Sequence, residues 1–174
     1  NENGDFVGFD IVIGNPPYIR QEELGSLKEI LSKTYSVYAG TADILVYFFE
    51  LGIKILKPNG TLSLISSNKF IRANYGAKLR EFLWGYNISK IIDFGELQVF
   101  EEAATFPVIV SINKSNNKKQ VEFTQISTLK FLILENFIRE NGKLLGEGSF
   151  NGQSWSLGDA TNTLILNKLK TNSY

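Results

Sequence analysis

The chain has 174 residues, 43% hydrophobic and 21% charged, a composition typical of a globular domain with a real core. It contains neither cysteine nor histidine, which excludes disulfides, thiolate nucleophiles, Cys/His zinc sites and histidine general bases. The formal net charge of +0 offers nucleic acid no broad basic field and leaves only local patches. Any chemistry must therefore use carboxylates, amides, hydroxyls or a bound cofactor, and we expect no metal site.

The sequence contains no methionine and opens on Asn-Glu-Asn-Gly, so we expect it to be a segment of a longer protein. No apolar run is long enough to span a bilayer. Nothing near Asn1 is typical of a signal peptide. We therefore expect a cytoplasmic location and no membrane contact.

The apolar pattern predicts an alternation of strands and helices that is typical of an α/β fold. Expected strands cover residues 9–14, 61–66, 88–94, 107–112 and 120–126. Expected helices cover residues 21–33, 41–57, 75–84, 129–140 and 160–170. No helix separates the third strand from the fourth, so we expect the strand at 107–112 to be antiparallel, as at the end of a doubly wound sheet.

Several finer expectations follow from the same pattern. The run at 9–14 is rich in β-branched residues and is predicted to be a buried strand, and Pro58-Asn59-Gly60 is predicted to end the second helix. We expect the insert at 21–40 to be mobile, and the Gly- and Ser-rich stretch at 142–158 to be loosely structured around a buried Trp155. In the third helix the apolar residues are expected to face inward and the charged ones outward: Leu79, Phe82 and Leu83 against Arg80 and Glu81.

The motif Asn15-Pro16-Pro17-Tyr18 directly follows the first expected strand. Each proline fixes its own φ and pushes the preceding residue toward an extended conformation, so the Pro16 carbonyl has a fixed direction. Ligands of open α/β sheets bind outside the carboxyl ends of strands. These four residues are therefore the first candidate site, and the alternative is a rigid turn with an asparagine cap and a surface tyrosine.

Ser67-Asn68-Lys69-Phe70 leaves the second expected strand in the same way. Asn68 and Lys69 could contact a nucleotide or a phosphate there, whereas a helix-capping asparagine and a solvated lysine are the alternatives. The connection at 96–106 is longer than two adjacent strands usually need, which indicates a functional loop.

In these residues the chain resembles the catalytic half of N6-adenine DNA methyltransferases, whose motif is present intact at residues 15–18. The other segments that follow in the order of that family are 43–60, 67–70, 79–83 and 99–100. The long segment after the Pro-Pro loop is similar to that of type IIG restriction–modification enzymes. The resemblance implies the C-terminal half of a Rossmann-like S-adenosylmethionine-dependent methyltransferase sheet, with its last strand antiparallel and a small α+β tail.

The resemblance also implies the roles of the site residues. The Asn15 Oδ1 and the Pro16 carbonyl would accept hydrogen bonds from adenine N6, within the rigid loop that Pro17 completes. Tyr18 would stack on an adenine that has left the duplex, and Phe100 would cover its opposite face, with Phe106 as the competing choice.

By the same resemblance, the cofactor is S-adenosylmethionine and the partners are double-stranded DNA and the remainder of the polypeptide. The Gly-rich loop and acidic residues that hold this cofactor precede the Pro-Pro motif in the family, so we expect them upstream of Asn1 and expect the isolated chain to be inactive. The strand at 9–14 would then be an edge with unpaired backbone groups. We divide the chain into a catalytic half at 1–114 and a linker leading toward a recognition domain at 115–174.

Two other functions remain open at this point. Protein glutamine methyltransferases and some RNA methyltransferases share the four residues at 15–18, because an amide or amine nitrogen poses the same chemical problem. A non-catalytic nucleic-acid-binding remnant that keeps the loop for its shape is the second alternative.

Overall fold

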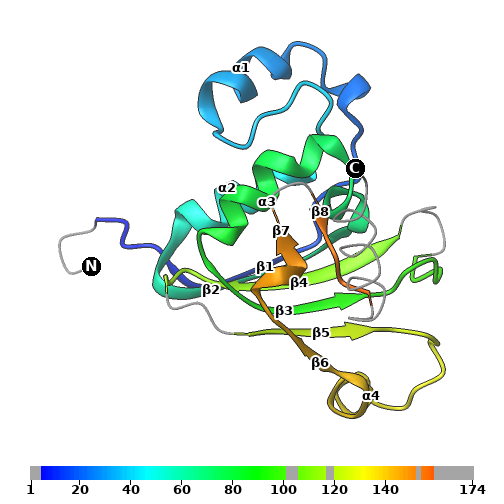
Figure 1. Cartoon of the computed structure of the whole chain (residues 1–174). Coiled ribbons are helices and arrows are strands. Elements are labelled where there is room, and N and C mark those ends of the chain that lie inside the picture. The colour runs from blue at the N-terminus through cyan, green and yellow to red at the C-terminus, as the bar shows by residue number, and fades with distance from the viewer. Residues whose placement is uncertain (1–4, 101–105, 117–119, 152–153, 159–174) are drawn as a thin grey trace, which may run out of the picture.

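The computed structural model describes residues 5–100, 106–116, 120–151 and 154–158, and their main feature is a six-stranded sheet with the order β1-β2-β4-β3-β5-β6 (Figure 1). The strands are β1 (Phe9–Gly14), β2 (Leu56–Ser67), β3 (Asn87–Asp93), β4 (Pro107–Asn113), β5 (Val121–Gln125) and β6 (Lys143–Leu145). Strand β1 is parallel to β2, and β3 is parallel to β5. Strand β4 lies antiparallel between β2 and β3, which confirms the predicted direction of this strand.

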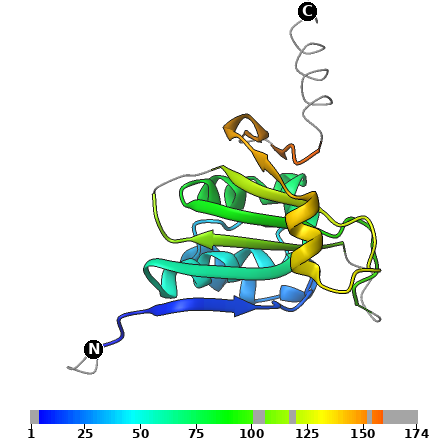
Figure 2. The same ribbon diagram turned by 90° about the horizontal axis from the view of Figure 1, so that it is seen from below.

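Helices lie on both faces of the sheet, and the two views agree on their arrangement (Figures 1 and 2). The α-helices are α1 (Leu27–Thr34), α2 (Leu45–Ile55), α3 (Ala77–Trp84) and α4 (Leu134–Asn141). Helices α2 and α3 cover one face and share its large apolar core, whereas α4 covers the other face, where Ile92, Ile126 and Ile138 form a smaller core. None of the helices in the described ranges is long and apolar enough to cross a membrane.

The boundary between α2 and β2 differs from the prediction. Helix α2 begins at Leu45 and ends at Ile55, and β2 starts at once at Leu56, so Pro58-Asn59-Gly60 lies inside the strand. The register with β1 shifts across these residues, from Phe9 opposite Leu56 to Ile11 opposite Thr61. Asn59 adopts a φ of 64° there, and its N–H donates to the carbonyl of Lys114. The three residues therefore form a bulge, which strands tolerate at their ends and edges.

Strand β1 is an edge strand. It was predicted to be buried, and this prediction was wrong. Its apolar side chains remain largely in solvent, with Ile11 63% and Ile13 78% exposed. A run of β-branched residues indicates a strand but does not say how many of its sides are covered, since coverage depends on distant parts of the chain. The expectation that this strand forms an edge of the sheet is confirmed.

The tail is more regular than predicted. Residues 142–158 contain β6 and the short hairpin of β7 (Phe150–Asn151) and β8 (Ser154–Trp155), so the expectation of a loose stretch was wrong. Trp155 is buried as predicted and packs edge-on against Phe70 and Phe150. Helix α4 begins at Leu134 instead of residue 129, and the helix expected at 160–170 lies outside the described residues.

The insert between β1 and α2, which was expected to be mobile, is held against α2 by one buried carboxylate. Its expected helix divides into a 3-10 turn, Gln21–Leu24, and α1. The Glu50 side chain on α2 accepts hydrogen bonds from the backbone N–H groups of Ser36 (3.1 Å) and Val37 (2.9 Å). It also forms an ion pair with Lys54 (2.7 Å). Burial alone would raise the pKa of this carboxyl, but Lys54 and the backbone donors together hold it below its usual value.

We expect Glu50→Gln to lower the free energy of unfolding at pH 7 by about 1–3 kcal/mol, the cost of weakening a buried charged hydrogen-bond network. Because the folded pKa is depressed, the contribution of the carboxylate is complete above its usual value of 4.5 and is lost as pH falls below it. The difference in the free energy of unfolding between wild type and variant, measured by urea titration, should therefore decrease from pH 7 to about pH 4. The control is Glu29→Gln, whose carboxylate is exposed. An unchanged difference would contradict the assignment.

Candidate target-base site

The Pro-Pro loop leaves the carboxyl end of β1 and is fixed at both ends. Pro16 is buried, whereas Asn15 and Pro17 are exposed, so the asparagine is accessible from outside the loop. At the far end, the Ile19 carbonyl accepts a hydrogen bond from the N–H of Ile44 at 3.1 Å, directly before α2. The loop is therefore held between strand β1 of the sheet and helix α2, which covers one face of the sheet.

The structure brings Tyr18 and Phe100 together. Both side chains are half-buried, and their ring centroids lie 6.1 Å apart with an interplanar angle of 60°. One stacked base occupies about 3.4 Å, so a base between parallel rings would need about 6.8 Å between them. The two rings are thus neighbours, and they must turn and separate slightly to receive a base between them.

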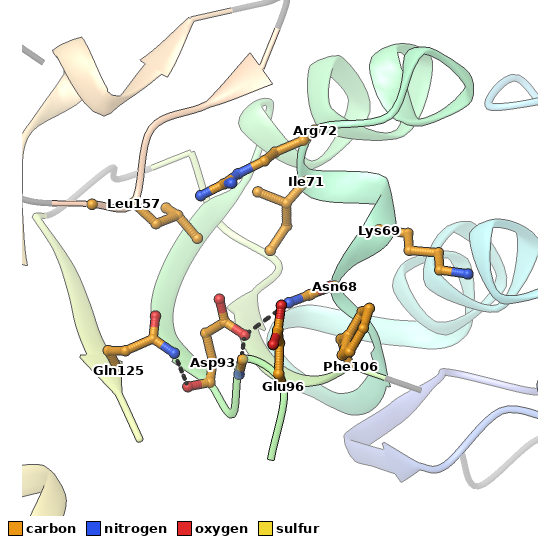
Figure 3. A pocket seen from close by; sticks show the side chains of 11 residues that line it. Asn68, Lys69, Ile71, Arg72, Asp93, Glu96, Phe106, Gln125 and Leu157 are labelled. Atoms are coloured by element: carbon orange, nitrogen blue, oxygen red, sulfur yellow. Dashed lines mark hydrogen bonds between the residues drawn. The ribbon is translucent and has the colours of Figure 1, made fainter. Parts of the chain in front are cut away.

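Asn68 and Lys69 follow β2 in a 3-10 turn, Asn68–Ile71, in which the Lys69 N–H donates to the Ser67 Oγ at 3.4 Å. Ser67, not Asn68, is the cap of this turn. The Asn68 side chain instead donates to the Asp93 Oδ1 at 3.0 Å, and its backbone N–H donates to the carbonyl of Phe106 at 2.7 Å. Lys69 points away from these partners (Figure 3).

A cavity of about 350 Å³ lies at the carboxyl ends of β2, β3 and β5 (Figure 3). It is lined by Asn68, Lys69, Ile71, Arg72, Asp93, Gly95, Glu96, Phe106, Gln125, Leu157 and Gly158. Phe106, the competing choice for a stacking residue, lines this cavity, whereas Phe100 lies against Tyr18. Within the described residues no group of three or more acidic side chains could hold a metal ion.

Sequence reasoning missed Asp93, which is the last residue of β3 and contacts Asn68. The available signal was an aspartate two residues before Gly95 at the end of a predicted strand, a pattern typical of an Asx turn. Such a turn can be predicted from the sequence, but the hydrogen bond between Asp93 and Asn68, in the turn after β2, cannot.

Arg80 supports the turn after β2 and is buried, so the prediction that it faces outward was wrong. Its Nη1 donates to the carbonyls of Phe70 and of Ala73. Burial lowers the pKa of this guanidinium, so these carbonyls replace the water it has lost. Gly76 lies directly against this pair, since a Cβ there would overlap the Phe70 carbonyl and stand 2.8 Å from the Arg80 Nη1.

Tyr75 links the same turn to the start of α2. Its hydroxyl donates to the Asp43 Oδ2 at 3.4 Å. Burial and, to a lesser degree, the Asp43 charge raise the pKa of this phenol, so it remains a neutral donor at every ordinary pH. The two segments that follow β1 and β2 are thereby joined.

An open mixed sheet with a Pro-Pro loop at the carboxyl end of a strand places this chain in the methyltransferase fold class. The solved structure of a protein assigned as a class I S-adenosylmethionine-dependent methyltransferase from Listeria monocytogenes is similar to it, with a TM-score of 0.59 and 21% identity over 76% of this chain and 42% of that one. At this identity the likeness shows the fold, and it confirms the predicted fold class.

The chain belongs to the Eco57I restriction-modification methylase family, which residues 1–100 match. It is 35% identical over 130 residues to the type II methyltransferase M.BstVI of Geobacillus stearothermophilus, covering 71% of this chain and 23% of the relative. It is 31% identical over 166 residues to the type II restriction enzyme and methyltransferase RM.Eco57I of Escherichia coli, covering 90% and 16%. The chain thus spans less than a quarter of either relative, and its resemblance to methyltransferases of restriction–modification systems is confirmed.

We expect Gly76→Ala to lower the free energy of unfolding by about 1–3 kcal/mol, because the added methyl has only backbone and a buried guanidinium to displace. Thermal melting followed by circular dichroism measures this loss. Gly146→Ala is the matched control, since no atom lies within 4 Å of the Cβ it would add. Equal melting temperatures for the two variants would contradict the packing described for Arg80.

Proposed function

We propose that this chain is the target-base half of a DNA methyltransferase that methylates N6 of adenine in a restriction–modification system. The observation that carries the proposal is the pairing of the rigid Asn15–Tyr18 loop with the Phe100 ring at one edge of the sheet. An amide, an aimed carbonyl and two aromatic rings are the groups that an exocyclic amine on a flat ring requires.

Asn15 and Pro16 act on the nucleophile. The lone pair of adenine N6 is delocalised into the purine ring, so this nitrogen attacks poorly while it stays planar. When the Asn15 Oδ1 and the Pro16 carbonyl accept its two N–H groups, the nitrogen is drawn toward tetrahedral geometry and its lone pair becomes directed. This is alignment and electrostatic stabilisation, and it needs none of the histidine or cysteine that the chain lacks.

Tyr18 and Phe100 hold the base. An adenine inside a duplex cannot reach the loop, so it must leave the stack at a cost of a few kcal/mol. Stacking on an aromatic ring returns about 1–3 kcal/mol per base. The half-buried Tyr18 keeps its place on the loop, and the Phe100 ring turns from its tilted position to cover the second face.

The residues present do not fit the cofactor, S-adenosylmethionine, which would supply the methyl group. Among the described residues no connection from a strand to an α-helix carries a Gly-rich turn, and the cavity of Figure 3 is lined by none of the residues at 15–18. We therefore assign the cofactor pocket to a part of the protein outside this sequence. The exposed apolar side chains of β1, Ile11 and Ile13, support an edge that packs against such a part.

The partners follow from the proposed reaction. They are double-stranded DNA and the remainder of the same polypeptide, with residues 115–174 leading toward a recognition domain. A cytoplasmic location follows from the same proposal, because the substrate is cellular DNA.

We expect Asn15→Ala in the intact enzyme to lower the rate of methyl transfer by about 100-fold or more, because one of two acceptors for the amine is removed. DNA binding should change little, since contacts of charged side chains with the phosphates dominate affinity and Asn15 carries no charge. Methylated positions mapped by sequencing and a DNA-binding titration measure the two quantities.

The matched control for this variant is Asn141→Ala, an exposed asparagine at the end of α4. Full transfer by Asn15→Ala would overturn the assigned mechanism. Methylation of a protein or an RNA substrate by the wild type, with none on adenine in DNA, would overturn the proposed substrate.

We expect Tyr18→Ala to reduce kcat/KM for methyl transfer by about 10-fold or more, the loss of one stacking contact. Tyr18→Phe, which keeps the ring, should retain most of the activity. Steady-state kinetics on a duplex with a single site distinguish the two variants. Equal losses for both would show that the hydroxyl, and not the ring face, is what the reaction requires.

A further inference from the structure

Asp93 lies where three strand ends meet, and five hydrogen bonds converge on it and on Asn68. The carbonyl of Asp93 accepts hydrogen bonds from the N–H of Ile126 (2.8 Å) and the Gln125 side chain (3.0 Å), which joins β3 to β5. Its carboxylate accepts from Gly95 and Asn68 through the same oxygen, Oδ1. Figure 3 shows this junction beside the cavity.

The first carboxylate bond fixes where the connection after β3 begins. The Gly95 N–H donates to the Asp93 Oδ1 at 2.9 Å, closing an Asx turn. Gly95 has a φ of 57°, which glycine adopts at little cost, and the Leu97 N–H then donates to the Phe94 carbonyl at 3.0 Å. These hydrogen bonds therefore fix the direction in which the backbone leaves β3.

Asn68, the donor of the second carboxylate bond, contacts both ends of the same connection. Asn68 donates through its side chain to Asp93, at the start of the connection, and through its backbone N–H to Phe106, at its end. A single residue on the turn after β2 thus bonds to Asp93 on one side of Phe100 in the sequence and to Phe106 on the other. The Phe94 N–H completes the closure by donating to the carbonyl of Pro107 at 3.0 Å.

We propose that Asp93 is a positioning residue for the target base: together with Asn68 it clamps the connection that carries Phe100, and so holds this ring at Tyr18. The proposal rests on the proposed function, in which the two rings enclose the adenine. Asp93 does not touch the base itself. Its removal leaves the ladder between β3 and β4 intact, because that pairing uses backbone groups, so the expected effect is on the loop and not on the sheet.

The kinetic test is a double-mutant cycle in the intact enzyme. Asp93→Ala and Phe100→Ala should each lower kcat/KM for adenine methylation by about 10-fold, because either change removes one stacking contact. If Asp93 acts through Phe100, the double variant should be no worse than Phe100→Ala alone. Losses that multiply would overturn the proposal.

Two further variants separate positioning from charge and from general damage. Asp93→Asn keeps an oxygen that can accept from Gly95 and should restore most of the activity. Gln125→Ala removes a neighbouring bond to the Asp93 backbone but leaves the carboxylate clamp, so it should behave as wild type. Failure of Asp93→Asn to restore activity would overturn a role based on hydrogen bonding.

A second readout does not depend on activity. 4-Fluorophenylalanine placed at position 100 reports the surroundings of this ring through its fluorine resonance. Asp93→Ala should move that resonance toward the value of the free amino acid, whereas Gln125→Ala should not. If Asp93→Ala does not fold, Asn68→Ala removes the other side of the same clamp and should give the same shift.

The results distinguish a failure of the proposed function from a failure of the clamp formed by Asp93 and Asn68. A wild-type enzyme that does not methylate adenine would overturn the proposed function, whatever the fluorine resonance shows. An unchanged resonance in both Asp93→Ala and Asn68→Ala would overturn the clamp, even in an enzyme that methylates adenine normally.

Discussion

The antiparallel placement of β4 between β2 and β3 is the constraint on which the rest of the site depends. Because β4 runs against its neighbours, the connection from β3 must turn back at the edge where β1 and β2 also end. That connection carries Phe100, and the loop after β1 carries Tyr18. Sheet topology alone therefore brings two aromatic residues from distant parts of the chain to the same edge.

A second layer of contacts keeps this edge in place. Buried Glu50 ties the insert to α2, and buried Arg80 ties the turn after β2 to α3. Both are charged groups away from water, and each is compensated by several backbone partners, as burial of charge requires. Each group holds a loop that begins near the carboxyl end of a strand, so the supporting network follows the edge and not the centre of the sheet.

The errors of prediction share one cause. Arg80 was placed outward because charged residues on helices usually face solvent. It lies inward because the Phe70 and Ala73 carbonyls of a separate turn need a donor there. Strand β1 was predicted to be buried, yet its apolar side chains are largely exposed, since nothing in its six residues states what covers them. The periodicity of apolar residues describes one segment of the chain. The groups that a side chain contacts in the fold belong to segments far away in the sequence.

The sequence by itself determined the order of strands β1 to β5 and helices α1 to α4, the direction of β4 and the four residues of the Pro-Pro loop, because these rest on local patterns and backbone restrictions. Only the tertiary structure decided that Phe100, and not Phe106, lies beside Tyr18. It alone showed that Asn68 and Asp93 meet across two strands. Such pairings follow from the register and crossing of strands, and the free energy that selects them comes from burial and hydrogen bonding summed over the whole sheet.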